Sequence, residues 1–129
     1  MGRESEEQKF IFEWATYNYK KYPELEKLMF CIPNGGSRNK LEAISLKKQG
    51  TKAGVSDLTV QVARGGYHGL WIELKVGKNK ASEKQLEFIE AVRNEGYCAR
   101  IVCGGLNVIE LIKDYMDGRI QRELWLDEI

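Results

Sequence analysis

Residues 54–75 read GVSDLTVQVARGGYHGLWIELK and contain two β-like runs, at residues 58–63 and 70–76, joined by a glycine-rich connection. Two such runs on either side of a glycine-rich turn are typical of an antiparallel hairpin. The second run is flanked by apolar residues and is followed by a helical pattern, which favours a central position in a sheet.

One face of the second run carries charge. Alternate side chains of a strand point the same way, so Glu73 and Lys75 share one side of the sheet. In a hairpin, Asp57 at the start of the first run reaches the level of these two side chains. Two carboxylates and an amine that converge in this way suit a hard cation such as Mg²⁺. The alternative is an exposed sheet face with alternating charges. This alternative is disfavoured because uncompensated charge on a central strand is costly.

The rest of the chain predicts an α/β fold, with a mixed central sheet of about four strands flanked by helices. Helical spacing and helix-boundary residues predict helices at residues 4–21, 39–49, 82–95 and 107–115, and apolar runs bounded by turn residues predict strands at 28–32, 58–63, 70–76 and 97–102. Ser82 is expected to cap the third of these helices, with Gln85 at the capping-box position.

Composition limits the class of protein. The chain has 129 residues, enough for a single domain at residues 1–129. Its apolar runs are strand-sized and its acidic N-terminus lacks an apolar core, so we expect neither a membrane span nor a signal peptide. Cys31, Cys98 and Cys103 form no CxxC pair, and we expect small buried thiols in a reducing cytosol. The expected location is cytoplasmic, not secreted.

Charge is unevenly distributed along the chain. Residues 38–84 carry ten basic and four acidic groups, whereas residues 1–37 and 85–129 have net charges of −1 and −4. A basic block around the carboxylates suits a polyanionic substrate, although charge alone equally favours a solvated lysine-rich loop. His68, the only histidine, is expected on the surface of the hairpin loop. The basic residues expected to contact phosphates are Arg38, Lys40, Lys47, Lys48, Lys52, Lys78, Lys80 and Lys84.

The ordered set of motifs resembles the PD-(D/E)xK nuclease superfamily. Ser56-Asp57 stands where that superfamily has Pro-Asp, and the Glu73-Leu74-Lys75 tripeptide matches its (D/E)xK element. The resemblance is closer still to the VRR-NUC branch, the virus-type replication-repair nucleases, and covers roughly residues 4–112. The segments that carry it are PNGG at 33–36, KKQGTKAGVSDL at 47–58, WIELK at 71–75 and SEKQ at 82–85.

This resemblance implies a restriction-endonuclease-like core and a metal-dependent DNA nuclease. Asp57 and Glu73 would hold Mg²⁺ or Mn²⁺, and Lys75 would orient the attacking water, stabilise its hydroxide form or neutralise charge in the transition state. Gln85 resembles the active-site glutamine of the family and would hydrogen-bond the water or the Lys75 amine. The alternative for Gln85 is a simple capping-box residue.

A further catalytic and metal-binding carboxylate from the first helix belongs to the family pattern. Glu7 is favoured because it borders the inward side of that helix, and Glu4 and Glu6 are the alternatives. All three can also be plain helix N-terminal charges.

The expected activity is hydrolysis of phosphodiester bonds in branched, flap or junction DNA during replication and repair, since no base-reading motif is visible. The alternatives are a non-catalytic nucleic-acid-binding module with the same fold and a small structural subunit. Standalone members of the branch resemble homodimers, and the compact build is similar to phage-encoded members. Residues 113–129 are expected to pack on the body or on another chain. We expect a homodimer, with the apolar residues 124–129 and the final helix as the candidates for the contact.

Overall fold

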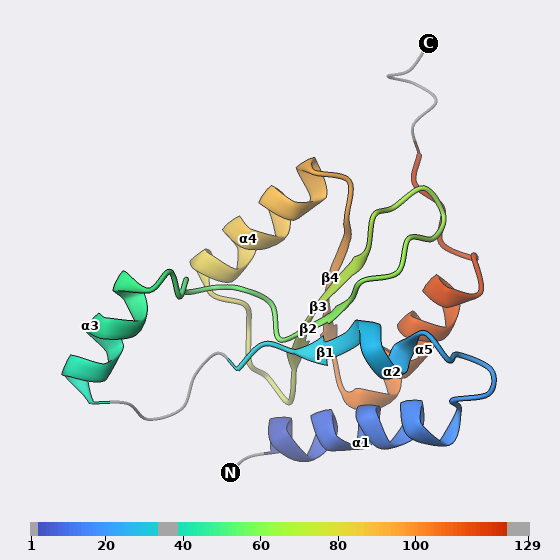
Figure 1. The fold of residues 1–129 in the computed structure, drawn as a ribbon, viewed down its shortest axis with the longest axis horizontal. Helices are drawn as coiled ribbons and strands as arrows, with labels where there is room; N and C mark the ends of the chain where they lie inside the picture. The colour runs from blue at the N-terminus through green and yellow to red at the C-terminus, as the bar shows by residue number, and fades with distance from the viewer. Residues whose placement is uncertain (1–2, 34–38, 124–129) are drawn as a thin grey trace.

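The computed structural model describes residues 3–33 and 39–123, and within them a four-stranded sheet is flanked by helices (Figure 1). In chain order the elements are α1 (Arg3–Tyr17), α2 (Leu25–Leu28), β1 (Met29–Cys31), α3 (Lys40–Lys48), β2 (Leu58–Val60), β3 (Leu70–Lys75), α4 (Glu83–Asn94), β4 (Cys98–Cys103) and α5 (Gly105–Met116). Each main element overlaps the range expected from the sequence, and the α/β fold with a mixed sheet is confirmed.

The sheet has the strand order β1-β2-β3-β4. β2 pairs antiparallel with β1 and with β3, and its register places Leu58 opposite Ile72. β3 and β4 run parallel, with α4 as the connection between them. The hairpin and the crossover therefore make β3 an interior strand, as expected.

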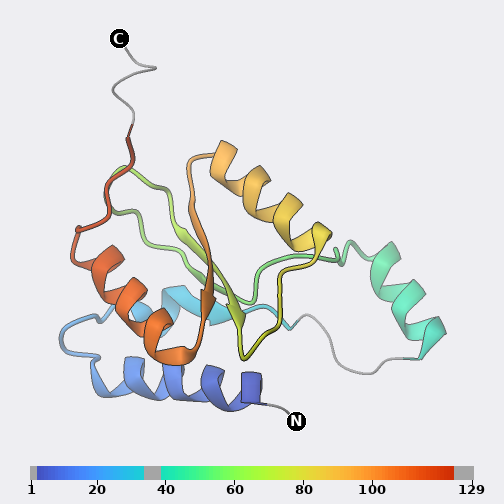
Figure 2. The same ribbon diagram turned by 180° about the vertical axis from the view of Figure 1, so that it is seen from behind.

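Helices cover both faces of this sheet. α1 and α5 pack together on one face, and α4 lies on the other (Figures 1 and 2). The β3 side chains Leu70, Ile72 and Leu74 are fully buried, and they join Ile11 of α1 and Ile112 of α5 in one core. Burial of this apolar surface is the main favourable term in folding. No described helix is long and apolar enough to cross a membrane.

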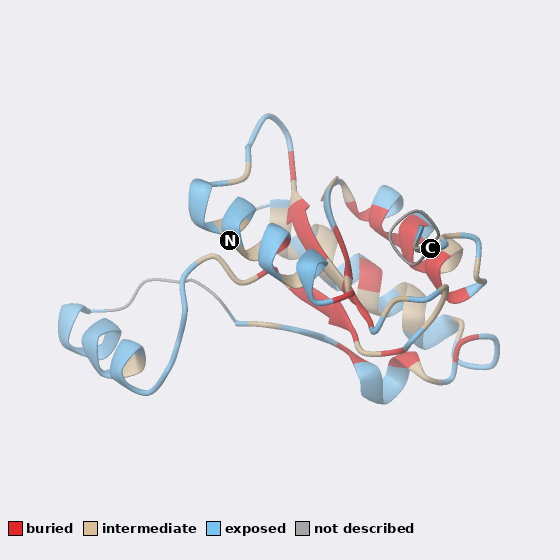
Figure 3. Ribbon diagram, turned by 90° about the horizontal axis from the view of Figure 1, so that it is seen from above, coloured by how far each residue is buried: buried red, intermediate tan, exposed pale blue. Residues whose placement is uncertain are grey.

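Helix α3 departs from this layered arrangement. It projects from the body on the segment between β1 and β2, and its residues are exposed apart from Leu46, which is half-buried (Figure 3). Asn39 caps it, because its side-chain oxygen accepts the Glu42 backbone N–H at 2.8 Å.

Two of the cysteine expectations are wrong. Cys98 is buried, but Cys31 and Cys103 are exposed. Both lie at the ends of the two edge strands of the sheet, β1 and β4, where no further strand covers them. His68 is exposed, as expected, and meets the Tyr97 ring edge-on.

The chain after α5 returns to the β2–β3 connection. The Arg122 backbone N–H donates to the Gly65 carbonyl at 2.8 Å, and Ile120 packs against the core. Gly65 has a φ of +59°, and a side chain there would collide with the Ile120 backbone. The described part of the C-terminal segment thus packs on its own chain, whereas residues 124–129, on which the tail contact was expected, lie outside the described residues.

Candidate active site

Asp57 and Glu73 meet where β2 begins and β3 nears its end. The Asp57 Oδ2 atom accepts the backbone N–H of Leu74 at 2.8 Å. This hydrogen bond holds the Asp57 carboxylate beside the strand position that carries Glu73. The two carboxylates come together because Asp57 immediately precedes Leu58, which pairs with Ile72.

The Glu73 carboxylate is almost completely enclosed, with 1% of the residue exposed. Its Oε2 atom accepts the Gln85 side-chain N–H at 3.1 Å and lies 3.6 Å from the Lys75 ammonium nitrogen. Its buried Oε1 atom has no hydrogen-bond partner within the described residues. A buried carboxylate oxygen without a partner is costly unless a cation or a donor completes it.

The pKa of Glu73 is raised to about 8, chiefly by burial. Hydrogen bonding to Asp57 and repulsion by its charge contribute to this rise, whereas the positive charge of Lys75 opposes it. A carboxyl group with a strongly raised pKa beside a second acid is typical of a functional site.

Gln85 connects this pair of acids to the start of α4. The Ser82 hydroxyl accepts the Gln85 backbone N–H at 3.2 Å, and the Gln85 side-chain oxygen accepts the Ser82 backbone N–H at 2.8 Å. The expected capping box is therefore present. The amide nitrogen of the same side chain donates to Glu73, and not to Lys75 as expected. Gln85 therefore serves as a capping-box residue and also contacts the site.

Among the three glutamates of the first helix, the structure brings Glu4 to the site. Glu4 borders the pocket, and burial together with repulsion by Asp57 raises its pKa. Glu7, which the sequence favoured, instead accepts the Gly105 backbone N–H at 3.0 Å and so caps the start of α5. Glu6 is exposed and does not border the pocket.

A cavity of about 760 Å³ opens over these groups. Its walls come from α1, α3, the segment between α3 and β2, β3 and the start of α4. Its lining residues are Glu4, Ala43, Leu46, Lys47, Thr51, Lys52, Ala53, Gly54, Val55, Asp57, Glu73, Lys75, Lys84 and Gln85. The lining thus combines acids, which suit a cation, with amines, which suit an anionic group next to that cation.

The expected phosphate-contacting residues surround this cavity unevenly. Lys47, Lys52 and Lys84 line it. Lys40 and Lys48 lie on the projecting helix α3, and Lys78 and Lys80 lie on the loop between β3 and α4. All seven are exposed, whereas Arg38 lies outside the described residues.

Two comparisons with known proteins bear on this site. The family model of the VRR-NUC domain matches residues 2–105. The chain belongs to the VRR-NUC family. A solved structure described as a VRR_NUC domain protein is 36% identical, with a TM-score of 0.77 over 92% of this chain and 91% of the other. No curated protein sequence matches the chain.

Membership of the VRR-NUC nuclease family implies a DNA substrate and a divalent metal, and the oxygen donors suit such an ion. Mg²⁺ binds one or two protein carboxylates together with waters and substrate phosphates. One Asp57 carboxylate oxygen accepts the Leu74 backbone N–H, which leaves the other oxygen for a metal ion. The Glu73 Oε1 atom has no hydrogen-bond partner in the described part of the chain. No cluster of three or more His, Cys, Asp or Glu side chains with metal-binding geometry occurs in residues 3–33 and 39–123. The donor set is therefore two carboxylates, with Glu4 nearby.

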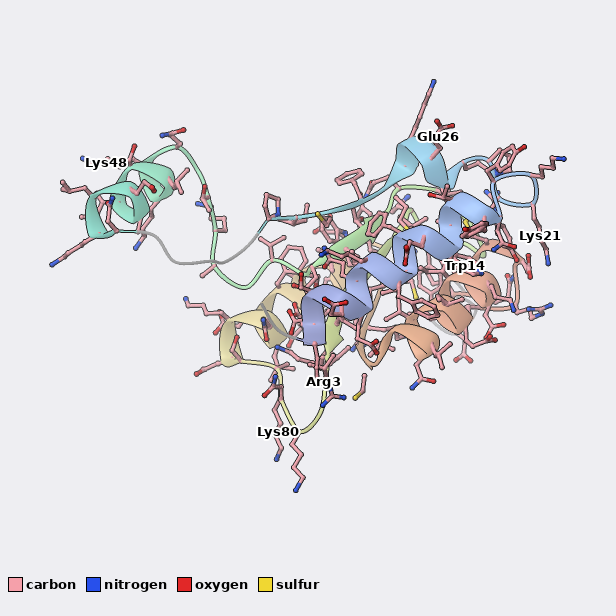
Figure 4. All side chains as sticks on the ribbon, turned by 90° about the horizontal axis from the view of Figure 1, so that it is seen from below. Arg3, Trp14, Lys21, Glu26, Lys48 and Lys80 are labelled. Carbon is pink, nitrogen blue, oxygen red and sulfur yellow. The ribbon has the colours of Figure 1, made fainter. Side chains whose placement is uncertain are left out.

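Sequence reasoning missed part of the wall of this VRR-NUC cavity. Thr51 borders it directly. Outside the cavity lining, the Arg3 guanidinium lies beside Gly77, on the loop that also carries Lys80 (Figure 4). For Arg3 the only available signal was a basic residue at the start of a helix, where the helix dipole disfavours positive charge.

Proposed function

We propose that this chain is a single-domain, Mg²⁺- or Mn²⁺-dependent DNA nuclease that hydrolyses phosphodiester bonds in branched, flap or junction DNA. The observation that carries the proposal is the meeting of Asp57 with the enclosed Glu73 at the base of a lysine-walled cavity. Acids beside a polyanion repel it unless a cation intervenes, so a module that only binds nucleic acid gains nothing from them.

Asp57 and Glu73 would hold the metal ion, with Glu4 as the candidate carboxylate from the first helix. A bound divalent ion polarises the scissile phosphate and makes a coordinated water more acidic. Glu4 takes the place of Glu7 in this proposal because Glu7 is engaged with the start of α5.

Lys75 and Gln85 would act on the groups around the scissile phosphate. Lys75, with a side chain that is 13% exposed, lies 3.6 Å from Glu73 and can offset negative charge that develops in the transition state. Gln85 fixes the Glu73 carboxylate through the 3.1 Å hydrogen bond, and hence orients the oxygen that remains for the metal.

The exposed lysines around the cavity would contact backbone phosphates. Such contacts position DNA without reading bases, so selectivity would come from the shape of the DNA. We propose that the enzyme acts in the cytoplasm of a bacterium or a phage-infected cell, during replication or repair, and that it works as a homodimer with one cavity for each of two strands.

The deciding experiment incubates the purified protein with flap, junction and linear duplex DNA in Mg²⁺, Mn²⁺ or EDTA. We expect cleavage with either metal, none in EDTA, and loss of cleavage in Asp57→Asn and Glu73→Gln. Glu13→Gln, which removes an exposed α1 carboxylate away from the cavity, is the matched control and should cleave normally. Cleavage that persists in EDTA or in both site variants would refute the proposal. Equal rates on linear and branched DNA would refute its structure selectivity alone.

A further inference from the structure

Glu7 connects α1 to the start of α5. Its carboxylate accepts the Gly105 backbone N–H at 3.0 Å, and the two helices lie side by side (Figures 1 and 2). Gly104, the residue before α5, provides no side chain to cap that helix. The first backbone N–H groups of a helix need acceptors, and a negative charge is favourable beside them. The cap of α5 therefore comes from another helix, so it also joins two elements.

The two helices approach closely at this point. A Cβ atom at Gly105 would lie 3.1 Å from the Glu7 backbone oxygen and 3.4 Å from the Phe10 ring. The absence of a side chain at Gly105 thus lets the α1 backbone come near the start of α5. The hydrogen bond and this close approach together restrict rotation of α1 about its own axis.

The start of α5 is itself fixed to the strand that carries Glu73. The Gly104 backbone N–H donates to the carbonyl of Lys75, the last residue of β3, at 2.9 Å. Gly104 has a φ of +86°, a conformation that glycine adopts readily. Glu7 is therefore connected to the end of β3 through two consecutive backbone N–H groups, those of Gly104 and Gly105.

Glu4 lies one helical turn before Glu7, at the end of α1 that reaches the cavity. Ile11, one turn after Glu7, is fully buried in the core, whereas Glu4 borders the cavity together with Asp57 and Glu73. Among the hydrogen bonds of the described residues, the one to Glu7 alone joins the first two turns of α1 to another element. This bond therefore holds the end of α1 that carries Glu4.

A small rotation of α1 would matter at the Glu4 carboxylate. The tip of a helical side chain lies about 6 Å from the helix axis, so a rotation of about 20° moves it by roughly 2 Å. A binding constellation tolerates displacements of only about 0.5 Å. Loss of the Glu7 contact would thus separate Glu4 from Asp57 and Glu73 by more than a shared ion allows.

We propose that Glu7 is a positioning residue, which fixes the rotation of α1 and so brings Glu4 to the metal-binding carboxylates. The inference rests on the proposed function, in which Glu4 is the carboxylate from the first helix. The alternative role for Glu7 is a helix cap that contributes stability alone. The two roles differ in whether the effect of Glu7 on metal affinity passes through Glu4.

Calorimetric titration with Mn²⁺ in the absence of DNA tests this proposal without any cleavage. We expect Glu7→Ala to lower the Mn²⁺ affinity by about tenfold. Glu7→Gln should bind nearly as tightly as wild type, because its amide oxygen can still accept the Gly105 N–H. In a Glu4→Gln background, Glu7→Ala should have no further effect on the affinity, since two residues that act as a unit are not additive.

Asn107→Ala is the matched control. It removes another hydrogen bond at the start of α5, from the Asn107 side-chain nitrogen to the Cys103 carbonyl at 2.9 Å, and leaves the Glu7 bond in place. It should lower the midpoint of thermal unfolding and leave the Mn²⁺ affinity unchanged. Gly105→Ala disturbs the same contact from α5, and replaces Glu7→Ala if that variant does not fold. It should lower the affinity only while Glu4 is present.

An unchanged affinity in Glu7→Ala overturns the proposal, and so does an equal loss with and without Glu4, because either result leaves Glu7 as a cap alone. An equal loss in Asn107→Ala also overturns it, since the effect would then follow the stability of α5 in general. In these cases wild type still binds Mn²⁺, and the proposed function stands. A wild-type protein that binds no Mn²⁺ would refute the proposed function and this inference with it.

Discussion

At the scale of single residues, Glu73 sets the chemistry of the cavity. Its carboxyl group is enclosed by the sheet, next to Asp57, and burial raises its pKa to about 8. Ionisation is therefore unfavourable even beside Lys75, and a bound cation would favour it. In the proposed function, this costly buried acid of the free protein would become a ligand of the metal ion.

The free energy of unfolding of the metal-free protein should depend on this group. Because the pKa of Glu73 is above its ordinary value of 4.5, its contribution is fully present below pH 4.5 and is lost as the pH rises through about 8. We expect the midpoint of thermal unfolding in EDTA to fall by on the order of 10 °C over this interval.

Glu73→Gln provides the control for this pH series, since glutamine has a similar shape and does not titrate. The variant should show a flatter pH dependence than wild type in the same EDTA buffers. An equal slope in both proteins would assign the pH dependence to other groups.

Lys75 should matter more for rate than for binding. Its ammonium group lies 3.6 Å from the Glu73 carboxylate, and three other lysines line the same cavity and can hold DNA. We expect Lys75→Ala to bind flap DNA nearly normally and to cleave it about 10²–10³-fold more slowly. Anisotropy and single-turnover rates measure the two effects. Lys113→Ala on α5 is the control, and an equal loss of binding and rate would reassign Lys75 to holding substrate.

At the scale of elements, the start of α4 ends the loop that follows β3 and also supplies Gln85 to the site. Gln85 closes the capping box with one end of its amide and holds Glu73 with the other. The two roles can be separated by substitution, because a carboxylate can replace the amide in the box but cannot donate to Glu73.

Gln85→Glu should therefore retain the cap and lose about 10–100-fold in cleavage rate. Ser82→Ala should show the opposite pattern, with a loss of about 0.5–2 kcal/mol in the free energy of unfolding and little change in rate. Thermal unfolding and single-turnover cleavage of both variants give the comparison. If both variants lose rate and stability together, the two roles are not separable.

The segment that delivers Asp57 depends on close packing at Gly54. This residue has a φ of +87°, and a Cβ atom there would lie 2.5 Å from the Lys84 carbonyl oxygen at the start of α4. Gly54→Ala should displace this segment and reduce both stability and cleavage. Gly50→Ala is the matched control, because Gly50 has a φ of +103° with open space around it, and should show only the backbone strain. Equal effects of the two changes would contradict a role for the Lys84 contact.

At the scale of the whole molecule, a bound metal ion should stabilise the fold. An ion that binds only the folded chain adds about 2.7 kcal/mol at a concentration 100 times its dissociation constant. We expect Mg²⁺ or Mn²⁺ to raise the midpoint of thermal unfolding in wild type and in Glu13→Gln, and not in Asp57→Asn. A shift retained in Asp57→Asn would place the ion elsewhere. This measurement does not require cleavage.

The sequence was sufficient to predict the order of the main elements and the meeting of Asp57 with Glu73 and Lys75, because strand alternation and hairpin pairing are local rules. It did not identify Glu4 over Glu7, since that choice depends on how α1 is rotated against the sheet and α5. The exposure of Cys31 and Cys103 depends on which strands lie at the edges, and the projection of α3 depends on missing tertiary contacts. Neither is encoded in local periodicity.

The alternation of side chains along β3 also decides what a copy with the wrong strand register would lose. Leu70, Ile72 and Leu74 are fully buried on one face, while Glu73 and Lys75 lie on the other. A shift of the strand by one residue would move all five to the wrong side at once. A misfolded copy with this register would lose its core together with the meeting of Asp57 and Glu73. Stability and the candidate site therefore depend on the same register.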